Sequence, residues 1–264
     1  MTNNIKKLTI AFVALVAIVS FSALIVNNYK TKTSFKDVNN KNPEKIKENP
    51  QDFVSAAVNK AAELRSENNT ITESDKLALL KLNSDDVIYG DKNAPVTLIE
   101  YSSLSCPHCA SFHREAFEKL KTDYIDTKKL RFIHRDFPLN QPALTAAMIA
   151  ICNNNHQNDQ EKSEKYYTFL RALLKTQDAW AFDQKYIEKL ESIAKLDGMS
   201  GKNFSSCISD NKLQQQILEK RMQAAKILKI QSVPTFFVND EVLEGYIDYQ
   251  TFQKAIDKKL LEKK

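Results

Sequence analysis

A Cys-x-x-Cys sequence, formed by Cys106, Pro107, His108 and Cys109, follows closely on an apolar run at residues 96–101. A short apolar run with β-branched and aromatic residues is typical of a buried strand, and proline is favoured in the first turn of a helix. This order predicts a strand that leads into a helix, with both cysteines in the first helical turn.

The start of a helix favours a thiolate, because its first backbone N–H groups are unpaired and carry the positive end of the helix dipole. We expect Cys106 to be the exposed thiol, with a pKa below the ~8.5 of a free cysteine, and Cys109 to be shielded one turn further on. His108 adds a polar group beside the sulfur, and Pro107 suits the first helical turn. A stabilised thiolate makes the disulfide easier to reduce, so the motif favours disulfide donation.

Zinc binding and covalent haem attachment are two other roles of a Cys-x-x-Cys sequence. A structural zinc site needs a second pair of ligands, but no second Cys-x-x-Cys exists, and His113 and His134 lack the expected histidine spacing. Haem attachment requires a histidine directly after the motif, where this chain has Ala110. We therefore expect neither a metal ion nor a cofactor.

Charge and composition exclude further function classes. The net charge of +5 includes Lys6 and Lys7 of an N-terminal leader, so the remainder carries +3, which is too little to favour nucleic acid as a partner. Only four glycines in 264 residues argue against glycine-rich nucleotide-binding loops. The four cysteines form an even number, which fits an oxidising compartment.

Residues 1–30 have the pattern of a signal peptide or a membrane anchor. Lys6 and Lys7 precede residues 8–26, which carry no charge, and a helix of that length at ~1.5 Å per residue would almost cross a bilayer. A cleaved signal and an uncleaved anchor both fit, and a buried helix of a soluble protein is the remaining alternative. The first two predict export to the periplasm, with contact to the inner membrane if the leader is uncleaved.

A linker and a helical extension are expected next. Residues 31–50 are rich in Lys, Asn and Pro and poor in large apolar groups, which predicts a flexible linker. Residues 51–85 predict two short helices, because apolar residues recur at helical spacing from 53 to 64, and Thr70 with Glu73 has the pattern of a capping box. These helices pack either on their own domain or on another copy of the chain.

Residues 86–264 predict one α/β domain with an all-helical insertion at about residues 140–229. A second strand is expected at 130–135, and a hairpin begins at Val233 and Pro234 before a final helix at 249–261. The Cys-x-x-Cys helix is expected to present one apolar face, made of Phe112, Ala116, Phe117, Leu120 and Tyr124. In the insertion, Cys152 and Cys207 are either buried free thiols or a second disulfide, which export favours.

These elements and motifs resemble the exported DsbA-type thiol:disulfide oxidoreductases of the thioredoxin superfamily. The resemblance covers about residues 86–264. The Cys-Pro-His-Cys motif at 106–109 is identical to that of the family, and Val233 and Pro234 match its valine and cis-proline. Glu100 stands at the place of the family's buried acid. Residues 50–85 depart from the short form of the family, which leaves the oligomeric state open.

The resemblance implies a thioredoxin fold and several roles for single residues. It implies a cis peptide between Val233 and Pro234 beside the Cys106 sulfur, with the Val233 backbone available to a substrate strand. It implies that Glu100 is buried, which would raise its pKa and make it a proton acceptor for Cys109; the alternative is a solvated carboxylate at a strand end. Cys152 and Cys207 resemble an extra cysteine pair that occurs in some branches.

The expected function is therefore donation of the Cys106–Cys109 disulfide to reduced, unfolded exported proteins through a mixed disulfide. The resemblance implies that a DsbB-type membrane oxidase restores the disulfide. An oligomeric disulfide isomerase or reductase is the first alternative. A membrane-tethered assembly or binding factor without catalysis is the second, and the intact cysteine motif argues against it.

Overall fold

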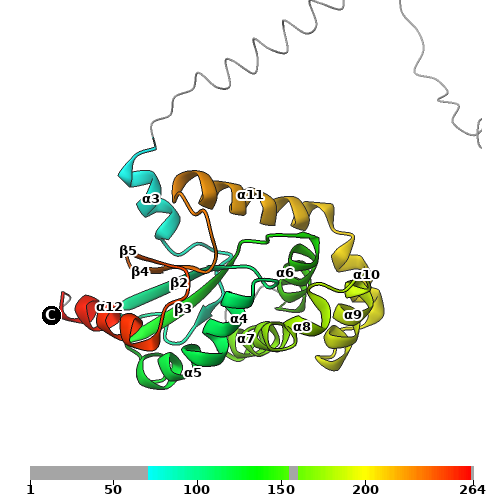
Figure 1. Ribbon diagram of the computed structural model, residues 1–264, viewed down its shortest axis with the longest axis horizontal. Coiled ribbons are helices and arrows are strands. Elements are labelled where there is room, and N and C mark those ends of the chain that lie inside the picture. The colour runs from blue at the N-terminus through cyan, green and yellow to red at the C-terminus, as the bar shows by residue number, and fades with distance from the viewer. Residues whose placement is uncertain (1–70, 155–159, 263–264) are drawn as a thin grey trace, which may run out of the picture. The chain divides into compact units, whose positions relative to one another are not determined.

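A five-stranded sheet with strand order β1-β3-β2-β4-β5 forms the centre of the domain (Figure 1). The structure, a computed structural model, describes residues 71–154 and 160–262. The leader, the linker and the first predicted helix of the extension lie outside the described residues. Among the residues that the structure describes, no helix has the length and apolar character needed to cross a membrane.

The central strand β2 (Val96–Ser102) is buried along its whole length, as its apolar sequence predicts. It pairs in parallel with β3 (Leu130–Asp136) and antiparallel with β4 (Thr235–Val238), which forms the predicted hairpin with β5 (Glu241–Glu244). The short edge strand β1 (Ile88–Tyr89) pairs antiparallel with β3 and was not predicted. Gly90 follows it with φ +100°, where a Cβ atom would lie 2.7 Å from the Ile125 side chain.

The helix after β2 is divided into α4 (Pro107–Glu115), α5 (Phe117–Leu120) and a π-helical turn (Lys121–Ile125), whereas the sequence predicts one continuous helix. Apolar residues at four-residue spacing drift by ~40° per step around an α-helix. A π-helical turn, with its wider i→i+5 hydrogen bonds, offsets this drift. The predicted apolar face therefore stays buried from Phe112 to Tyr124.

In its described residues, the insertion between β3 and β4 contains helices and no strand, as predicted. Its longer helices are α6 (Gln141–Asn154), α7 (Gln160–Lys175), α9 (Tyr186–Leu196) and α11 (Asn211–Ile227). The helices α8 (Gln177–Trp180) and α10 (Gly201–Ile208) were not predicted, because they are too short for apolar residues to recur clearly at helical spacing.

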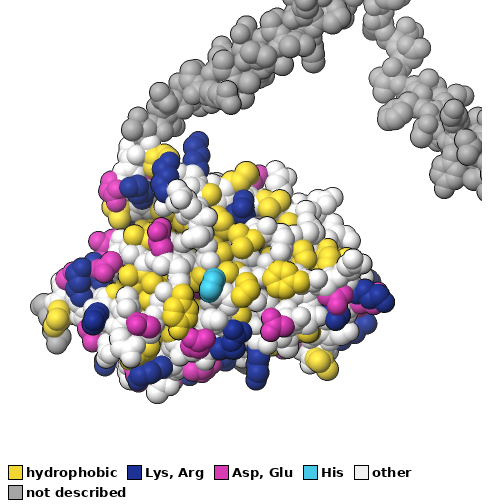
Figure 2. Space-filling view, viewed as in Figure 1, with side chains coloured by type: hydrophobic (Ala, Val, Ile, Leu, Met, Phe, Trp, Pro, Cys, Tyr) yellow, Lys and Arg dark blue, Asp and Glu magenta, His cyan; other side chains and the backbone are white. Residues whose placement is uncertain are grey.

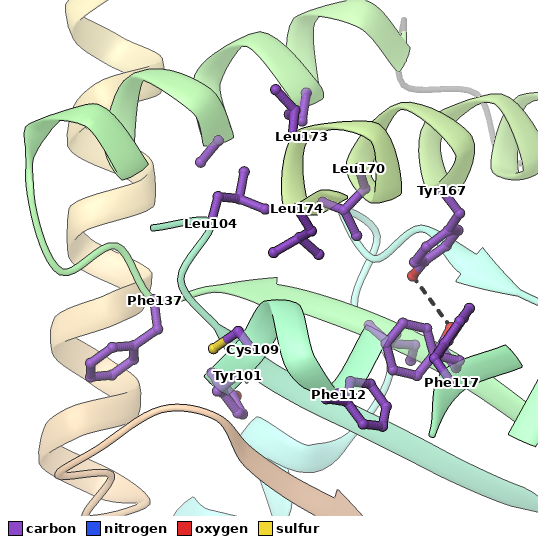
Figure 3. Close-up of a cluster of buried hydrophobic side chains, with 14 of the residues drawn as sticks. Tyr101, Leu104, Cys109, Phe112, Phe117, Phe137, Tyr167, Leu170, Leu173 and Leu174 are labelled. Carbon is purple, nitrogen blue, oxygen red and sulfur yellow. Dashed lines mark hydrogen bonds between the residues drawn. The ribbon is translucent and has the colours of Figure 1, made fainter. Parts of the chain in front are cut away.

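Helices cover both faces of the sheet (Figure 1). The predicted last helix, α12 (Tyr249–Leu261), packs with α4 on one face, where Phe112 lies 5.3 Å from Phe252 between ring centroids. Figure 3 shows Phe112 and Phe117 within this aromatic core. On the other face Arg135 of β3 donates hydrogen bonds to backbone carbonyls of Leu79 and Lys81 at the end of α3 (Glu73–Leu80).

The capping box of α3 lies two residues later than the sequence analysis placed it. Thr72, not Thr70, is the N-cap, and its hydroxyl accepts from the Asp75 backbone N–H at 3.2 Å while Asp75 accepts from the Thr72 N–H at 2.8 Å. An aspartate in the third helical position therefore takes the place of the expected glutamate. No residue of α3 is buried, and Leu77 remains 45% exposed.

Candidate active site

The two motif cysteines occupy the first turn of α4. Cys106 is the N-cap residue, Pro107 takes the first helical turn, and both cysteines are free thiols. Cys109 is fully buried, as predicted, and Figure 3 shows it beside Tyr101 within the cluster of buried hydrophobic side chains. Cys106 is only 6% exposed, so the prediction of an exposed first sulfur was wrong.

The covering of Cys106 comes from the loop before β4. The Val233–Pro234 peptide bond is cis, as the resemblance implies. In its thiol form, Cys106 Sγ donates a hydrogen bond to the carbonyl oxygen of Val233 at 3.5 Å. Residues far apart in the sequence thus meet at the sulfur, and Pro234, which has no N–H group, adds no competing donor.

The surroundings of Cys106 stabilise its thiolate. A hydrogen bond from the Cys109 thiol lowers the pKa of Cys106 and is the largest influence on it. Burial raises this pKa. The backbone N–H groups of Cys109 and His108 and the charge of His108 lower it further. The pKa of Cys106 falls to about 6 as a result. Most of the effect therefore comes from groups at the start of α4.

Cys109 is influenced in the opposite direction. Burial raises its pKa well above the ordinary range of a thiol, and the hydrogen bond to Cys106 and the negative charge of Glu100 raise it further. Two thiols one helical turn apart therefore differ in protonation at neutral pH. Cys106 is the thiolate of the pair and Cys109 remains a thiol.

Glu100 lies beneath this pair and is fully buried, which excludes a solvated carboxylate. Burial alone would raise its pKa, but charges and hydrogen bonds from His113 and His134 lower it to about 2. His113 Nε2 lies 2.8 Å and His134 Nδ1 3.5 Å from the same carboxylate oxygen, Oε2. The expected raised pKa was therefore wrong, because the sequence analysis did not foresee two histidines beside the acid.

Glu100, His113 and His134 also form a group of metal-ligand type. Within the described ranges their donor atoms all lie within 4.8 Å of one another. In this arrangement the imidazole nitrogens and the carboxylate hydrogen-bond to one another, which accounts for their proximity without an ion. Neither motif cysteine belongs to the group, so the structure does not favour the zinc alternative for the Cys-x-x-Cys sequence.

Gln177 of α8 is a site residue that the sequence analysis missed. Its side-chain N–H group donates to the carbonyl oxygens of Leu104 at 2.7 Å and Cys106 at 3.1 Å, and the side chain is buried. The insertion thereby holds the backbone that carries the first thiol. No pattern in the sequence points to a single glutamine in a four-residue helix.

His113, His134 and Asp136 were also missed as site residues, although a signal exists for each. His113 follows Cys109 by four residues, which places both on one face of α4. His134 is the direct partner of Glu100 in the β2–β3 register, and Asp136 follows it on the same face of β3. The separation of the two strands in sequence hid this proximity.

His108 is the only histidine that the described residues expose. Figure 2 shows a histidine surrounded by hydrophobic side chains on the surface of the molecule. A surface of this kind can accept apolar side chains of an extended or unfolded polypeptide.

Cys152 of α6 and Cys207 of α10 are bonded, with sulfur atoms 2.10 Å and Cα atoms 6.1 Å apart. The bond closes a segment with a sequence separation of 55. It joins two helices of the insertion and takes no part in the hydrogen bonds around Cys106.

Comparisons with known proteins agree with this geometry. A family model described as thioredoxin matches residues 82–258. A protein-disulfide oxidoreductase relative from Rickettsia typhi is 32% identical over 180 residues, which cover 68% of this chain and 64% of the relative. The chain thus spans slightly less than two thirds of the length of that relative. Disulfide bond formation protein D of Bacillus subtilis is 24% identical over 183 residues, 66% of this chain and 76% of that protein.

Solved structures show the same fold. The crystal structure of alpha-DsbA1 from Wolbachia pipientis superimposes with a TM-score of 0.64 and 33% identity, covering 71% of this chain and 99% of that one. Oxidised BdbD from Bacillus subtilis, at 22% identity, gives a TM-score of 0.59 over 67% of this chain and 93% of that one. The sheet, the Cys-x-x-Cys helix and the helical insertion therefore form a thioredoxin-like fold. The chain belongs to the DsbA-like protein-disulfide oxidoreductases of the thioredoxin superfamily.

Proposed function

We propose that this protein donates the Cys106–Cys109 disulfide to reduced substrate proteins through a mixed disulfide. The observation that carries the proposal is the opposite shift of the two thiol pKa values, to about 6 for Cys106 and upward for Cys109. A thiolate that is stable at neutral pH favours the reduced pair, so the disulfide is readily passed to a substrate.

The transfer takes two exchange steps. A substrate thiolate attacks Cys106 Sγ, the bond to Cys109 breaks, and its electron pair goes to Cys109 Sγ, which takes up a proton. A second substrate thiolate then attacks the substrate sulfur of the mixed disulfide. Cys106 leaves as a thiolate, and the substrate departs with its own disulfide. The low pKa makes Cys106 a good leaving group in this second step.

Three further residues support these steps. Val233 presents its backbone beside the Cys106 sulfur, where an extended substrate segment can pair with it, and Pro234 fixes the adjacent loop. Glu100 acts as the proton relay for Cys109, because its charge is felt by that thiol and no solvent reaches either side chain. Because the pKa of Glu100 is low, Glu100 is a carboxylate before and after the reaction and carries the proton only during its transfer.

The substrates are reduced, unfolded exported proteins, and a DsbB-type membrane oxidase restores the disulfide. The location that fits this chemistry is the periplasm, where disulfides persist. The alternative of an oligomeric isomerase depends on the helical extension at residues 51–85, of which residues 51–70 lie outside the described residues. Light scattering with a scrambled-substrate refolding assay separates the two: a monomer that oxidises reduced protein supports disulfide donation, whereas a stable oligomer that rescues scrambled disulfides supports isomerisation.

Covalent trapping tests the proposal directly. In Cys109→Ser, a substrate disulfide with Cys106 cannot be resolved within the enzyme, so incubation with an oxidised small disulfide and a reduced unfolded protein should accumulate the mixed disulfide. Mass spectrometry should locate the bond at Cys106, and Cys106→Ser should give no adduct. An adduct at another cysteine, or none in Cys109→Ser, would contradict the proposed mechanism.

A further inference from the structure

A row of polar side chains runs across the face of the sheet beneath α4. Glu100 of β2 pairs with His134 of β3, and the next positions on the same face, Ser102 and Asp136, pair with each other. His113 of α4 contacts Glu100 from above. Four ionisable side chains thus lie together on a sheet face whose other residues are mostly apolar.

The contacts in this row connect the active site to the exterior. Glu100 Oε2 lies 3.5 Å from His134 Nδ1, and His134 Nε2 lies 3.2 Å from Asp136 Oδ1. The side chains of Glu100 and His134 have no exposed surface, whereas that of Asp136 is 13% exposed. His134 and Asp136 line a cavity of about 670 Å³, which α3 and α11 also border.

The inner end of the row has an unused acceptor. Glu100 Oε1 is buried and has no hydrogen-bond partner within the described part of the chain. Cys109, whose pKa the Glu100 charge raises, is also fully buried. A buried carboxylate with a free acceptor, whose charge acts on the buried thiol, can accept a proton and pass it to Cys109.

The chemistry requires a proton at Cys109. When a substrate thiolate opens the disulfide, Cys109 leaves as a thiolate in a buried site that strongly favours the neutral thiol. Cys106 has no such need, because its pKa of about 6 keeps it a thiolate at neutral pH. The proton must therefore reach the one cysteine that solvent does not contact.

We propose that His134 and Asp136 conduct this proton from the cavity beside α11 to Glu100, which passes it to Cys109. The inference rests on the proposed disulfide-donor function. The electron pair of the broken S–S bond goes to Cys109 Sγ, which takes a proton from His134 Nδ1 through the Glu100 carboxylate, so Glu100 is unprotonated before and after the step. His134 is left neutral with its remaining proton on Nε2, and a turn of the ring brings the vacant nitrogen to Asp136, by way of which water in the cavity returns the second proton. Reoxidation runs the same route outward.

The charge state of His134 agrees with this role. Burial lowers its pKa, but hydrogen bonds and charges of Asp136 and Glu100 outweigh burial and raise it to about 9. His134 therefore holds a proton at neutral pH and can supply it at once.

Among the described residues around His134, the other titratable groups do not compete for that proton. From α7, Tyr167 accepts a hydrogen bond from the His134 backbone N–H at 3.0 Å, and burial keeps the pKa values of Tyr166 and Tyr167 well above the ordinary range. On the opposite face of the sheet, Arg135 is paired with Asp86 at 2.7 Å. From α4, His113 hydrogen-bonds to Glu100 rather than to His134.

The test compares rates of disulfide exchange in the full-length protein. The readout is the release of Cys106 and Cys109 thiols, quenched and counted with a thiol-specific alkylating reagent at successive times. The variants are His134→Gln and Asp136→Asn. The matched control is Glu191→Gln, which removes a carboxylate on α9, outside the row. Each oxidised protein is mixed with a reduced peptide across a range of pH, in H2O and in D2O.

We expect His134→Gln to slow the opening of the disulfide by on the order of 10²-fold, the lower end of what a positioned acid or base contributes. Asp136→Asn should slow it less, and the solvent isotope effect and the alkaline limb of the pH profile should change in both. The equilibrium constant with glutathione should change far less than the rate. Imidazole added to His134→Ala should partly restore the rate, because the adjoining cavity can admit it.

The proton route would be overturned if Asp136→Asn and a folded His134 variant both opened the disulfide at the wild-type rate with the wild-type isotope effect. It would also be overturned if the variants lost as much in the equilibrium constant with glutathione as in the exchange rate. If no His134 variant folds, Asp136→Asn alone decides. Failure of the proposed function is distinct, because the wild-type protein and the Glu191→Gln control would then transfer no disulfide to the peptide.

Discussion

The two cysteine pairs of this protein differ in where the helices place them. Cys106 and Cys109 lie in the first turn of α4, whereas Cys152 and Cys207 lie near the carboxyl ends of α6 and α10. A helix start stabilises a thiolate and a helix end disfavours it. The first pair is thereby prepared to exchange its disulfide, and the second has no comparable stabilisation of a thiolate. The position of a cysteine pair along its helices therefore decides, more than the presence of two cysteines, whether the pair is reactive or structural.

The largest expected effect is on activity. Cys106→Ser should abolish disulfide transfer to a reduced protein, because the other free thiol of the described residues, Cys109, is fully buried and stays protonated. The double variant Cys152→Ser, Cys207→Ser should retain transfer. A thiol-release assay with reduced, unfolded substrate measures both. Loss of transfer in the double variant, or transfer in Cys106→Ser, would remove the distinction between the pairs.

The second effect is on stability and concerns the other pair. The chain-entropy model gives about 4 kcal/mol for the loop that the Cys152–Cys207 bond closes, so the double serine variant should lose up to about that free energy of unfolding. Denaturant unfolding of the oxidised wild type and the double variant measures it. Mass spectrometry that finds both thiols free in protein recovered from the exported compartment would refute the bond.

The third effect tests whether the insertion supports the catalytic pair. Gln177→Leu removes the side-chain donor of the Leu104 and Cys106 carbonyls, of which Cys106 keeps the Ala110 N–H, and should cost about 2 kcal/mol of unfolding free energy. It should also reduce the exchange rate, because the Cys106 backbone loses a support. The control is Gln215→Leu, an exposed glutamine on α11. Equal unfolding free energies of the two variants would show that α8 does not hold the site.

The smallest effect concerns His108. His108→Leu should raise the pKa of Cys106 only slightly, because the histidine charge is the weakest of the influences on the thiol. The disulfide should become correspondingly less oxidising. A thiolate titration of the variant measures the shift, with Lys195→Leu on α9 as the remote cationic control. An unchanged titration would show that the Cys109 thiol and the backbone N–H groups alone lower the pKa of Cys106.

Local patterns in the sequence were sufficient for much of the fold. The buried β2 strand, the Cys-x-x-Cys helix, the β4–β5 hairpin and the long insertion helices each carry a period or a turn signal over many residues. The strand β1 and the helices α8 and α10 are short, and their place depends on what they pack against. The capping box of α3 was misplaced for a related reason, since Thr70 and Thr72 offer similar local signals.

The site was predictable only where its chemistry is local. Cys106, Cys109 and Pro107 act within one helical turn, so their spacing suffices. The ionisation of Glu100 depends on His113 and His134, which reach it from another helix and another strand. Burial alone would raise its pKa, and only the assembled structure reveals the two partners that reverse the sign.

The central claim is that the fold gives two neighbouring thiols opposite protonation. The most direct test is an ultraviolet titration of thiolate absorbance in the reduced protein over roughly pH 4 to pH 10, with Cys109→Ser and Cys106→Ser as references. We predict one thiolate per molecule with a midpoint at about pH 6, present in Cys109→Ser and absent in Cys106→Ser, and no second thiolate at alkaline pH. The midpoint in Cys109→Ser should stay close to that of the wild type, because the serine hydroxyl can donate to Cys106 in place of the Cys109 thiol. Two thiolates that titrate together near ~8.5, the value of a free cysteine, would contradict the account.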